Sequence, residues 1–133
     1  MPHEFPIRVY YEDTDLAGIV YYANYLKFIE RGRSEWIRDL GVDQTALRDD
    51  HNIVFAVRRV EADYLRSARF DDMLRVTTEL VSETGARITL EQAVWRGEEK
   101  LFAAMVVLVC MTLEGTVARL PADIRRKLVP AVH

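Results

Sequence analysis

Four apolar segments separated by short gaps follow Asn52, and they constrain the fold more than any other feature of this chain. The segments span residues 53–64, 74–80, 88–94 and 101–113. Alternation of apolar and polar residues in the middle two predicts β-strands, and the last is so continuously apolar that we expect a strand covered on both faces. Because parallel strands need long crossover connections, gaps this short predict antiparallel neighbours.

The residues before Asn52 predict a strand, a loop and a helix. Ile7, Val9 and Tyr11 alternate within 5–11, which favours a strand. Between 22 and 40 the apolar residues instead recur at spacings of three and four, which is typical of one helical face. We expect further short helices at 43–50 and 121–128. Together these elements predict an α+β domain with an antiparallel sheet of about five strands.

Three residues bear on the long helix. Asn24 is a candidate N-cap, and Gly41 is a reasonable stop after Leu40. Gly32 costs about 1 kcal/mol relative to alanine inside a helix, which a close approach by other backbone would explain. Because residues 22–40 are so apolar, we expect the sheet to curl around this one long central helix.

The composition fits a single domain spanning 1–133 and excludes several partners. The 133 residues match the usual domain size, and the net charge of −3 without a long basic stripe argues against nucleic acid. The one cysteine, Cys110, lies in an apolar run, where a buried, inert thiol is expected. Apolar runs fall far short of the roughly 20 residues of a membrane span, and the acidic N-terminal segment lacks a signal peptide. We therefore expect a cytoplasmic protein without a membrane span.

The segment from Tyr10 to Tyr25 carries the strongest chemical signal. It contains three acids, one glycine and five tyrosines, and it leads directly into the expected helix. A carboxylate there would lie near free backbone N–H groups and the positive end of the helix dipole. Such an arrangement suits acyl chemistry, because the N–H groups can stabilise an oxyanion while the carboxylate attacks or activates water.

The same residues also allow other interpretations of this segment. Acids in a loop are commonly solvated or cap a turn. A calcium-binding loop is excluded, because an EF-hand requires Asp or Asn where Ala17 stands and Glu where Asn24 stands. The three histidines are scattered, and no spacing of His or Cys suggests zinc.

Several motifs of the chain resemble the hotdog-fold thioesterases of the 4-hydroxybenzoyl-CoA thioesterase type, most closely their Tol–Pal-associated (YbgC) branch. The motifs are YYEDTD at 10–15, GIVYYANY at 18–25, ERGRSEW at 30–36 and ARFDDML at 68–74. The resemblance implies that Asp15 is the catalytic carboxylate and that a backbone N–H near Tyr22 polarises the thioester carbonyl. Tyr11 matches a tyrosine typical of the branch. Many members of that branch carry histidine at the position of Tyr22, so a side-chain role for histidine is absent here.

We therefore predict an acyl-CoA thioesterase. Asp15 acts as nucleophile, through a mixed anhydride, or as general base for water, and no metal or organic cofactor is implied. The resemblance also implies a homodimer or homotetramer with the active site where two subunits meet. The alternatives are a non-catalytic acyl-CoA or acyl-carrier-protein binding module and, less favoured, a hotdog dehydratase.

Binding of CoA by an acidic protein requires a local cluster of cations, because the CoA phosphates are anionic. Salt should then weaken binding and raise the Michaelis constant. The candidate side chains are Arg58, Arg59, Arg66, Arg69 and Arg87.

Overall fold

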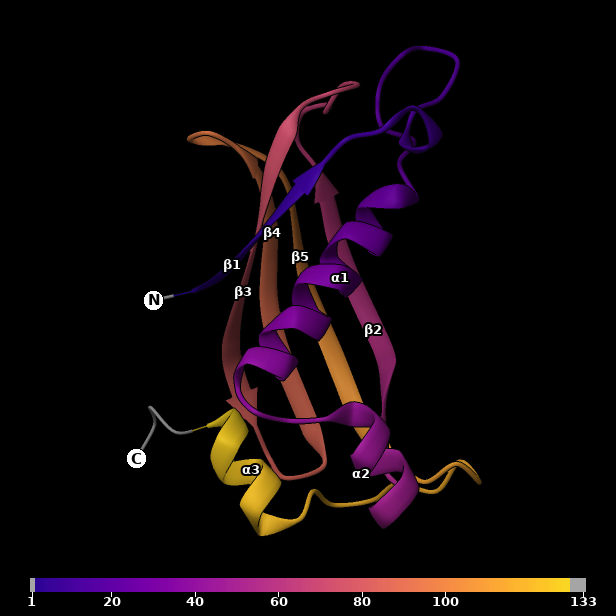
Figure 1. Cartoon of the computed structure of the whole chain (residues 1–133), viewed down its shortest axis with the longest axis vertical. Coiled ribbons are helices and arrows are strands. Elements are labelled where there is room, and N and C mark those ends of the chain that lie inside the picture. Colours follow the sequence, from indigo (N-terminus) through magenta and orange to yellow (C-terminus); the bar gives the residue numbers. More distant parts are fainter. Residues whose placement is uncertain (1, 130–133) are drawn as a thin grey trace.

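The computed structural model describes residues 2–129 of the chain (Figure 1). Its elements in chain order are β1 (His3–Arg8), the 3-10 turn η1 (Tyr11–Asp13), α1 (Asn24–Asp39), α2 (Gln44–His51), β2 (Val54–Tyr64), β3 (Met73–Glu83), β4 (Arg87–Arg96), β5 (Glu99–Met111) and α3 (Ala122–Leu128). The predicted α+β class is confirmed. Within residues 2–129, no helix is long and apolar enough to cross a membrane.

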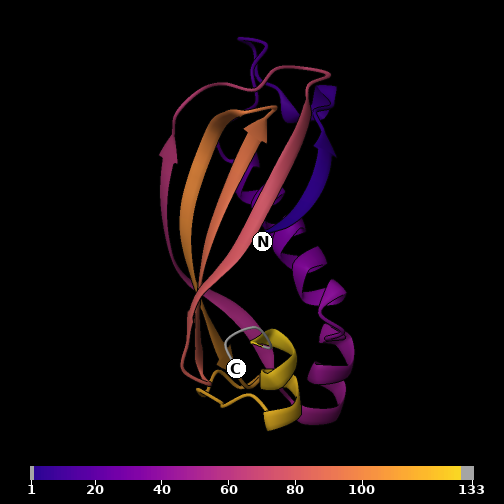
Figure 2. The same cartoon turned by 90° about the vertical axis from the view of Figure 1, so that its left-hand side faces the viewer.

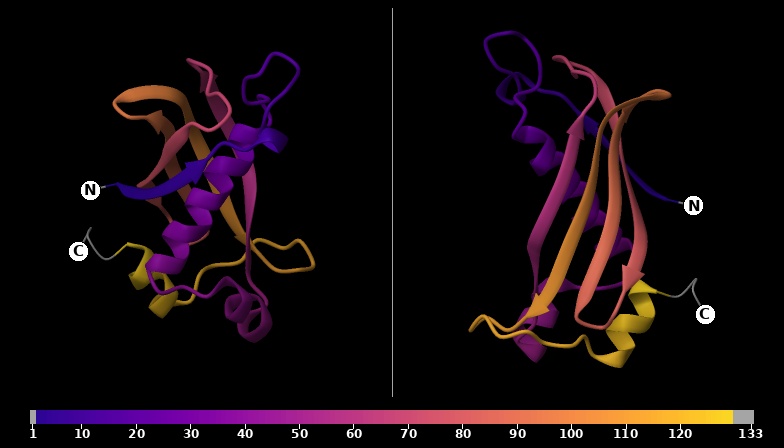
Figure 3. Two further views of the ribbon diagram at one scale, coloured as in Figure 1. Left: turned by 45° about the horizontal axis from the view of Figure 1, so that its top comes forward. Right: turned by 180° about the vertical axis from the view of Figure 1, so that it is seen from behind.

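The five strands form one antiparallel sheet in the order β1-β3-β4-β5-β2. The three consecutive strands β3, β4 and β5 pair through short turns, as their spacing predicts. β2 precedes β3 in sequence but lies on the far side of the sheet beside β5, so β1 and β2 are the two edges. Figure 3 shows the four strands β2 to β5 side by side from behind.

Helix α1 lies along one face of the sheet and packs on β1, β3 and β4 (Figure 2). Its buried side includes Phe28, Ile29 and Trp36, while Lys27 and Arg31 on the other side are exposed. The expected enclosure of one central helix by the sheet is therefore not confirmed. The sheet covers α1 on one side only, and the shorter helices α2 and α3 lie at one end of the sheet.

Gly32 lies at the closest contact between α1 and the sheet. A Cβ added there would lie 3.0 Å from Val76 Cβ and closer still to Val76 Cγ1. The expected close approach is thus present, but a side chain of β3 makes it rather than backbone. Next to it, the buried amide of Gln92 donates to the Ile29 carbonyl at 2.9 Å and to Thr78 Oγ1 at 2.8 Å, which ties the helix to the sheet.

Several predicted element ends differ from the structure. The first strand ends at Arg8 rather than Tyr11, because residues 11–13 turn into η1. Asn24 is not the N-cap of α1: Ala23 holds that position, and Asn24 instead donates its side-chain amide to the Asp13 carbonyl. The predicted stop is confirmed, since Gly41 has a φ of 87°.

The apolar strand β5 is not fully covered on both faces. Its inward side chains, among them Phe102, Val106 and Leu108, are buried, whereas the outward Met105 and Val107 are half-exposed. The chain alone therefore covers one face of β5 completely and leaves the apolar stripe on the other face partly open to solvent.

Candidate active site

A tight loop between η1 and α1 presents Asp15. Thr14 and Val20 pair as an isolated bridge, and Asp15 N–H donates to the Ile19 carbonyl at 2.9 Å. Gly18, with a φ of 79°, allows the chain to reverse, because residues with a Cβ rarely adopt that conformation. The Asp15 carboxylate accepts the Ala17 N–H through Oδ1 at 2.9 Å and is otherwise exposed. One carboxylate oxygen is therefore fixed, and the side chain as a whole faces solvent.

Asp13 has the opposite surroundings. It is only 8% exposed, and its Oδ2 accepts the Tyr10 N–H at 2.8 Å. Its backbone carbonyl accepts the Tyr21 N–H and the Asn24 side-chain amide, both at 2.9 Å. Asp13 therefore joins the loop to the start of the helix, and its contacts are those of a structural residue.

The start of α1 offers free donors beside Asp15. Asn24 N–H donates to the Tyr21 carbonyl at 2.8 Å, which begins the helical pattern. Within residues 2–129, the N–H groups of Tyr22 and Ala23 donate to no acceptor. Such unpaired groups at a helix N-terminus, together with the positive end of the dipole, favour an anion or a polarised carbonyl oxygen.

Asp15 and Tyr22 line one common cavity of about 280 Å³. The other residues that line it are Ile19, Val20, Tyr21, Tyr25, Tyr64, Leu65, Arg66 and Ser67. Two hydrogen bonds fix the segment after β2 against the loop and the helix: Val20 N–H donates to the Ala68 carbonyl at 2.8 Å, and Ala68 N–H donates to the Tyr25 hydroxyl at 3.0 Å. The cavity, which we call the Asp15 pocket, is thus built by two segments far apart in sequence, residues 15–25 and 64–67.

Aromatic rings form the inner wall of the Asp15 pocket. The Tyr64 ring lies 6.0 Å from Tyr22, 5.7 Å from Tyr25 and 5.0 Å from Phe102, between ring centroids. Burial raises the pKa of both Tyr25 and Tyr64 above the ordinary value of a phenol. Both side chains therefore remain neutral hydroxyls at physiological pH.

Tyr25 and Tyr64 are pocket residues that sequence reasoning did not identify. In the sequence, Tyr25 falls on the apolar face of the expected helix, and Tyr64 is the last residue of an expected strand. The one available signal was the density of tyrosines around the motif, which does not say which rings face a cavity.

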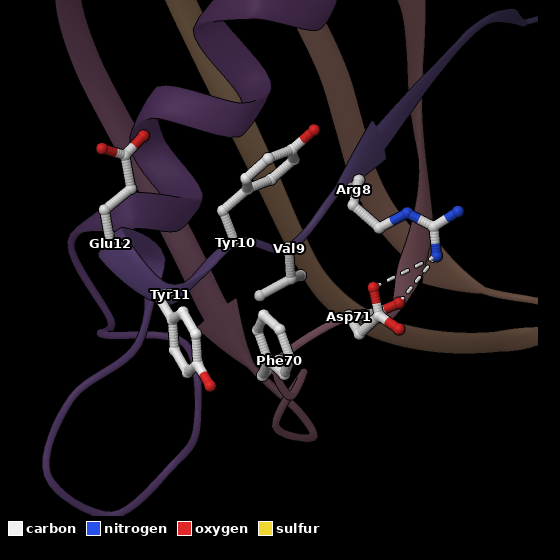
Figure 4. Close-up of a pocket in the computed structure, with 7 residues that line it drawn as sticks. All are labelled: Arg8, Val9, Tyr10, Tyr11, Glu12, Phe70 and Asp71. Atoms are coloured by element: carbon white, nitrogen blue, oxygen red, sulfur yellow. Dashed lines mark hydrogen bonds and ion pairs between the residues drawn. The ribbon is translucent and has the colours of Figure 1, made fainter.

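Tyr11, the third predicted site residue, lies elsewhere. Its ring stacks on Phe70 with centroids 4.4 Å apart and planes 10° apart. Both rings border a larger cavity of about 600 Å³, which we call the aromatic hollow (Figure 4). The residues lining it are Arg8, Val9, Tyr10, Tyr11, Glu12, Phe70 and Asp71. The structure brings Asp15 and Tyr22 together but leaves Tyr11 out of their pocket, so a role for Tyr11 in the chemistry stays a prediction.

The candidate arginines are not equivalent. Arg66 lines the Asp15 pocket and pairs with Glu99 at 3.1 Å, while Arg59 pairs with Glu61. Among residues 2–129, Arg69 has no ion-pair partner.

Arg87 lies at the end of the sheet that is remote from the Asp15 pocket. Arg96, at the other end of β4, donates to the Ser67 carbonyl at 3.2 Å beside the Asp15 pocket. The ten residues of β4 extend roughly 30 Å at the usual rise of a strand. Arg87 is therefore too distant to contact the same part of a bound ligand as Arg66 or Arg69.

Residues 9–128 match the family model described as "Thioesterase-like superfamily". The acyl-CoA thioesterase YbgC of Haemophilus influenzae is 43% identical over 109 residues, which cover 82% of this chain and 80% of that protein. The acyl-CoA thioester hydrolase YbgC of Escherichia coli O6:H1 is 41% identical over 108 residues, with 80% of each chain covered.

A solved structure is also similar to this chain. The crystal structure of a probable thioesterase from Bartonella henselae superimposes with a TM-score of 0.88 and 40% sequence identity. The match covers 91% of this chain and 100% of that one. Both the fold and the sequence of that protein are therefore similar to those described above.

Proposed function

This chain belongs to the thioesterase-like superfamily and is a thioester hydrolase, and we propose that it cleaves acyl-CoA in the Asp15 pocket. The products are a carboxylic acid and CoA. One observation carries the proposal: Asp15, whose side chain is exposed, and Tyr22, whose N–H is unpaired within residues 2–129, line the same cavity at a helix N-terminus.

The chemistry divides between these two groups. The Tyr22 N–H donates to the thioester carbonyl oxygen and stabilises the negative charge that develops on it. Asp15 either removes a proton from an attacking water or attacks the carbonyl carbon itself to give a mixed anhydride, which water then hydrolyses. In both routes the C–S bond breaks, the CoA thiolate leaves, and it takes up a proton from solvent. The chain carries tyrosine at position 22, so the donor is the backbone and requires no particular side chain.

The surroundings of the pocket support water as the second substrate. Asp15 is exposed, so water reaches the carboxylate without a conformational change. The tyrosine-rich wall is apolar enough to hold an acyl group, and its neutral hydroxyls add hydrogen-bonding positions.

A dehydratase is less well supported. The described part of the chain contains one His–acid contact, in which His3 Nε2 lies 2.8 Å from Asp39 Oδ2. Asp39, however, is the last residue of α1, about 22 Å from its start at a rise of 1.5 Å per residue. That pair therefore lies outside the Asp15 pocket.

We also expect residues 1–133 to act as one hotdog domain that assembles into a homodimer or homotetramer in the cytoplasm. The free edge β2 supports assembly, because Val57, Val60 and Tyr64 on its inward face are all exposed in the single chain. An edge strand with unpaired backbone groups and an apolar inward face is a ready template for another chain. The Asp15 pocket adjoins the end of this strand, through Tyr64 and Leu65.

The test is a turnover assay in which a thiol reagent detects released CoA. We would use CoA thioesters of rising chain length together with one aromatic member, because the acyl group is the least constrained part of the proposal. Release of thiol with multiple turnovers supports hydrolysis. Tight binding of all thioesters with no release would instead identify a non-catalytic acyl-CoA binding module.

A further inference from the structure

The aromatic hollow is the largest cavity described above, yet Asp15 does not line it. Val9 forms its floor and is only 1% exposed, while the rings around it are open: Tyr10 is 62% exposed, Tyr11 79% and Phe70 46%. Figure 4 shows Val9 between the Tyr10 ring on one side and the stacked Tyr11 and Phe70 rings on the other. Three exposed rings around an apolar floor form a surface suited to a planar aromatic ligand.

The polar groups of the hollow restrict the chemical class of the ligand that can bind there. Its single cation, Arg8, donates to the Asp71 carbonyl at 2.8 Å and lies 3.7 Å from the Asp71 carboxylate. Glu12 adds a second carboxylate to the lining. A flat ring that carries N–H donors complements these acceptors.

The hollow and the Asp15 pocket are close enough to hold two ends of one molecule. Tyr11 and Asp15 are four residues apart, so their Cα atoms are separated by at most about 14 Å. The segment after β2 lines both cavities, with Arg66 and Ser67 on the Asp15 pocket and Phe70 and Asp71 on the hollow. Arg69 lies between them in the chain, and no residue in the range 2–129 neutralises it in an ion pair.

We propose that the aromatic hollow binds the purine base of the CoA substrate, with Arg69 contacting its phosphates. This rests on the proposed function, since the thioester end must occupy the Asp15 pocket. A purine stacks on aromatic side chains, and its amino group can donate to Glu12 or Asp71.

The experiment compares two substrates with the same acyl group, one on CoA and one on pantetheine, which lacks the nucleotide. In Tyr10→Ala, the KM for the CoA thioester should rise at least about fivefold, the lower end of the cost of losing one base–aromatic stack. The kcat for both substrates and the KM for the pantetheine thioester should stay at the wild-type values. Tyr10→Leu, which keeps bulk without the ring, should behave like Tyr10→Ala and serves if the alanine variant does not fold.

Two further variants complete the design. Arg69→Gln should also raise the KM for the CoA thioester alone, and this KM should depend less on salt than that of the wild type. Leu113→Ala is the matched control, because Leu113 is an exposed apolar side chain outside both cavities. It should leave both substrates unaffected.

Direct binding of AMP distinguishes a failure of the purine assignment from a failure of the proposed function. Wild type should bind AMP, AMP should compete with the CoA thioester, and Tyr10→Ala should weaken both effects. Equal losses on both thioesters would overturn the proposal, because the hollow would then only support the loop. AMP binding without any change in the KM for the CoA thioester would overturn the assignment to CoA in favour of a free nucleotide. If wild type hydrolyses neither thioester, the proposed function fails, and the AMP titration still decides whether the hollow takes a purine.

Discussion

Asp13 and Asp15 are two positions apart in sequence and have opposite surroundings. The side chain of Asp13 is buried and accepts a backbone N–H, and its carbonyl accepts two more donors. Asp15 is exposed at the edge of a cavity that contains free backbone donors. Asp13 stabilises the loop, and the loop holds Asp15 exposed at the cavity.

The two aspartates should therefore respond differently to the same substitution. Asp15→Asn keeps the size of the side chain and its acceptor for Ala17 N–H but removes the charge, so turnover should fall at least about a hundredfold. Asp13→Asn keeps an acceptor for Tyr10 N–H and should reduce turnover much less. Turnover numbers on variants shown by circular dichroism to be folded decide the matter. Near-native turnover of Asp15→Asn would reject the mechanism, and a larger loss in Asp13→Asn would mean that the wrong aspartate had been chosen.

Cys110 gives a second prediction, on pH and stability. Burial, with a smaller contribution from the Glu83 carboxylate, raises the pKa of its thiol from 9.0 to about 11. Between these values the unfolded chain loses the proton and the folded chain keeps it. The free energy of unfolding should therefore be unaffected by this group below pH 9 and fall by up to about 3 kcal/mol as the pH rises to 11.

Urea unfolding of wild type and Cys110→Ala across this pH range isolates the effect. The alanine variant is less stable at pH 8 because it leaves a small cavity, but the difference between the two proteins should shrink as the pH rises. A constant difference from pH 8 to 11 would show that the thiol does not carry the pH dependence. The tyrosines with raised pKa values are present in both proteins and cancel in the comparison.

At the scale of elements, α1 and β3 pack closely because Gly32 has no Cβ. Alanine at position 32 would favour the helix by about 1 kcal/mol, but its methyl group would overlap Val76. Overpacking of this kind usually costs about 1–3 kcal/mol. We expect Gly32→Ala to destabilise the protein despite its better helix propensity, as measured by urea unfolding.

A double-mutant cycle with Val76→Ala tests the cause. Removing the two Val76 methyl groups creates the space that the new methyl group needs, so Gly32→Ala should cost less in that background. Equal costs in both backgrounds would place the origin of the effect elsewhere in the helix.

Local patterns predicted most elements, and long-range contacts explain what they missed. Short turns fixed β3, β4 and β5 as antiparallel neighbours, but nothing in the local sequence shows that β2 pairs with β5. The motif places Asp15 and Tyr22 at one helix start, and in the structure both residues line the same cavity. Tyr25 and Tyr64 were missed because strand pairing, rather than spacing, brings Tyr64 opposite Phe102 and next to Tyr25. Asn24 resembled an N-cap but is used by the preceding loop instead.

At the scale of the whole molecule, the open edge of the sheet predicts association. Light scattering at micromolar concentration should give the mass of a dimer or tetramer. Val60→Lys places a charge on the inward face of β2 and should shift the mass toward the monomer. Val81→Lys is the matched control, because Val81 is exposed on β3, away from that edge. A monomeric wild type would contradict both the assembly and a site shared between subunits.

The position of Tyr64 gives this edge a further meaning. β2 ends at Tyr64, and the next three residues line the Asp15 pocket, so whatever pairs with the strand also braces the wall beside the carboxylate. If a second copy of the chain pairs with β2, activity per molecule should decline on dilution, because the partners separate and the wall loses its support. Output from such a protein would rise more steeply than in proportion to the number of copies that a cell makes.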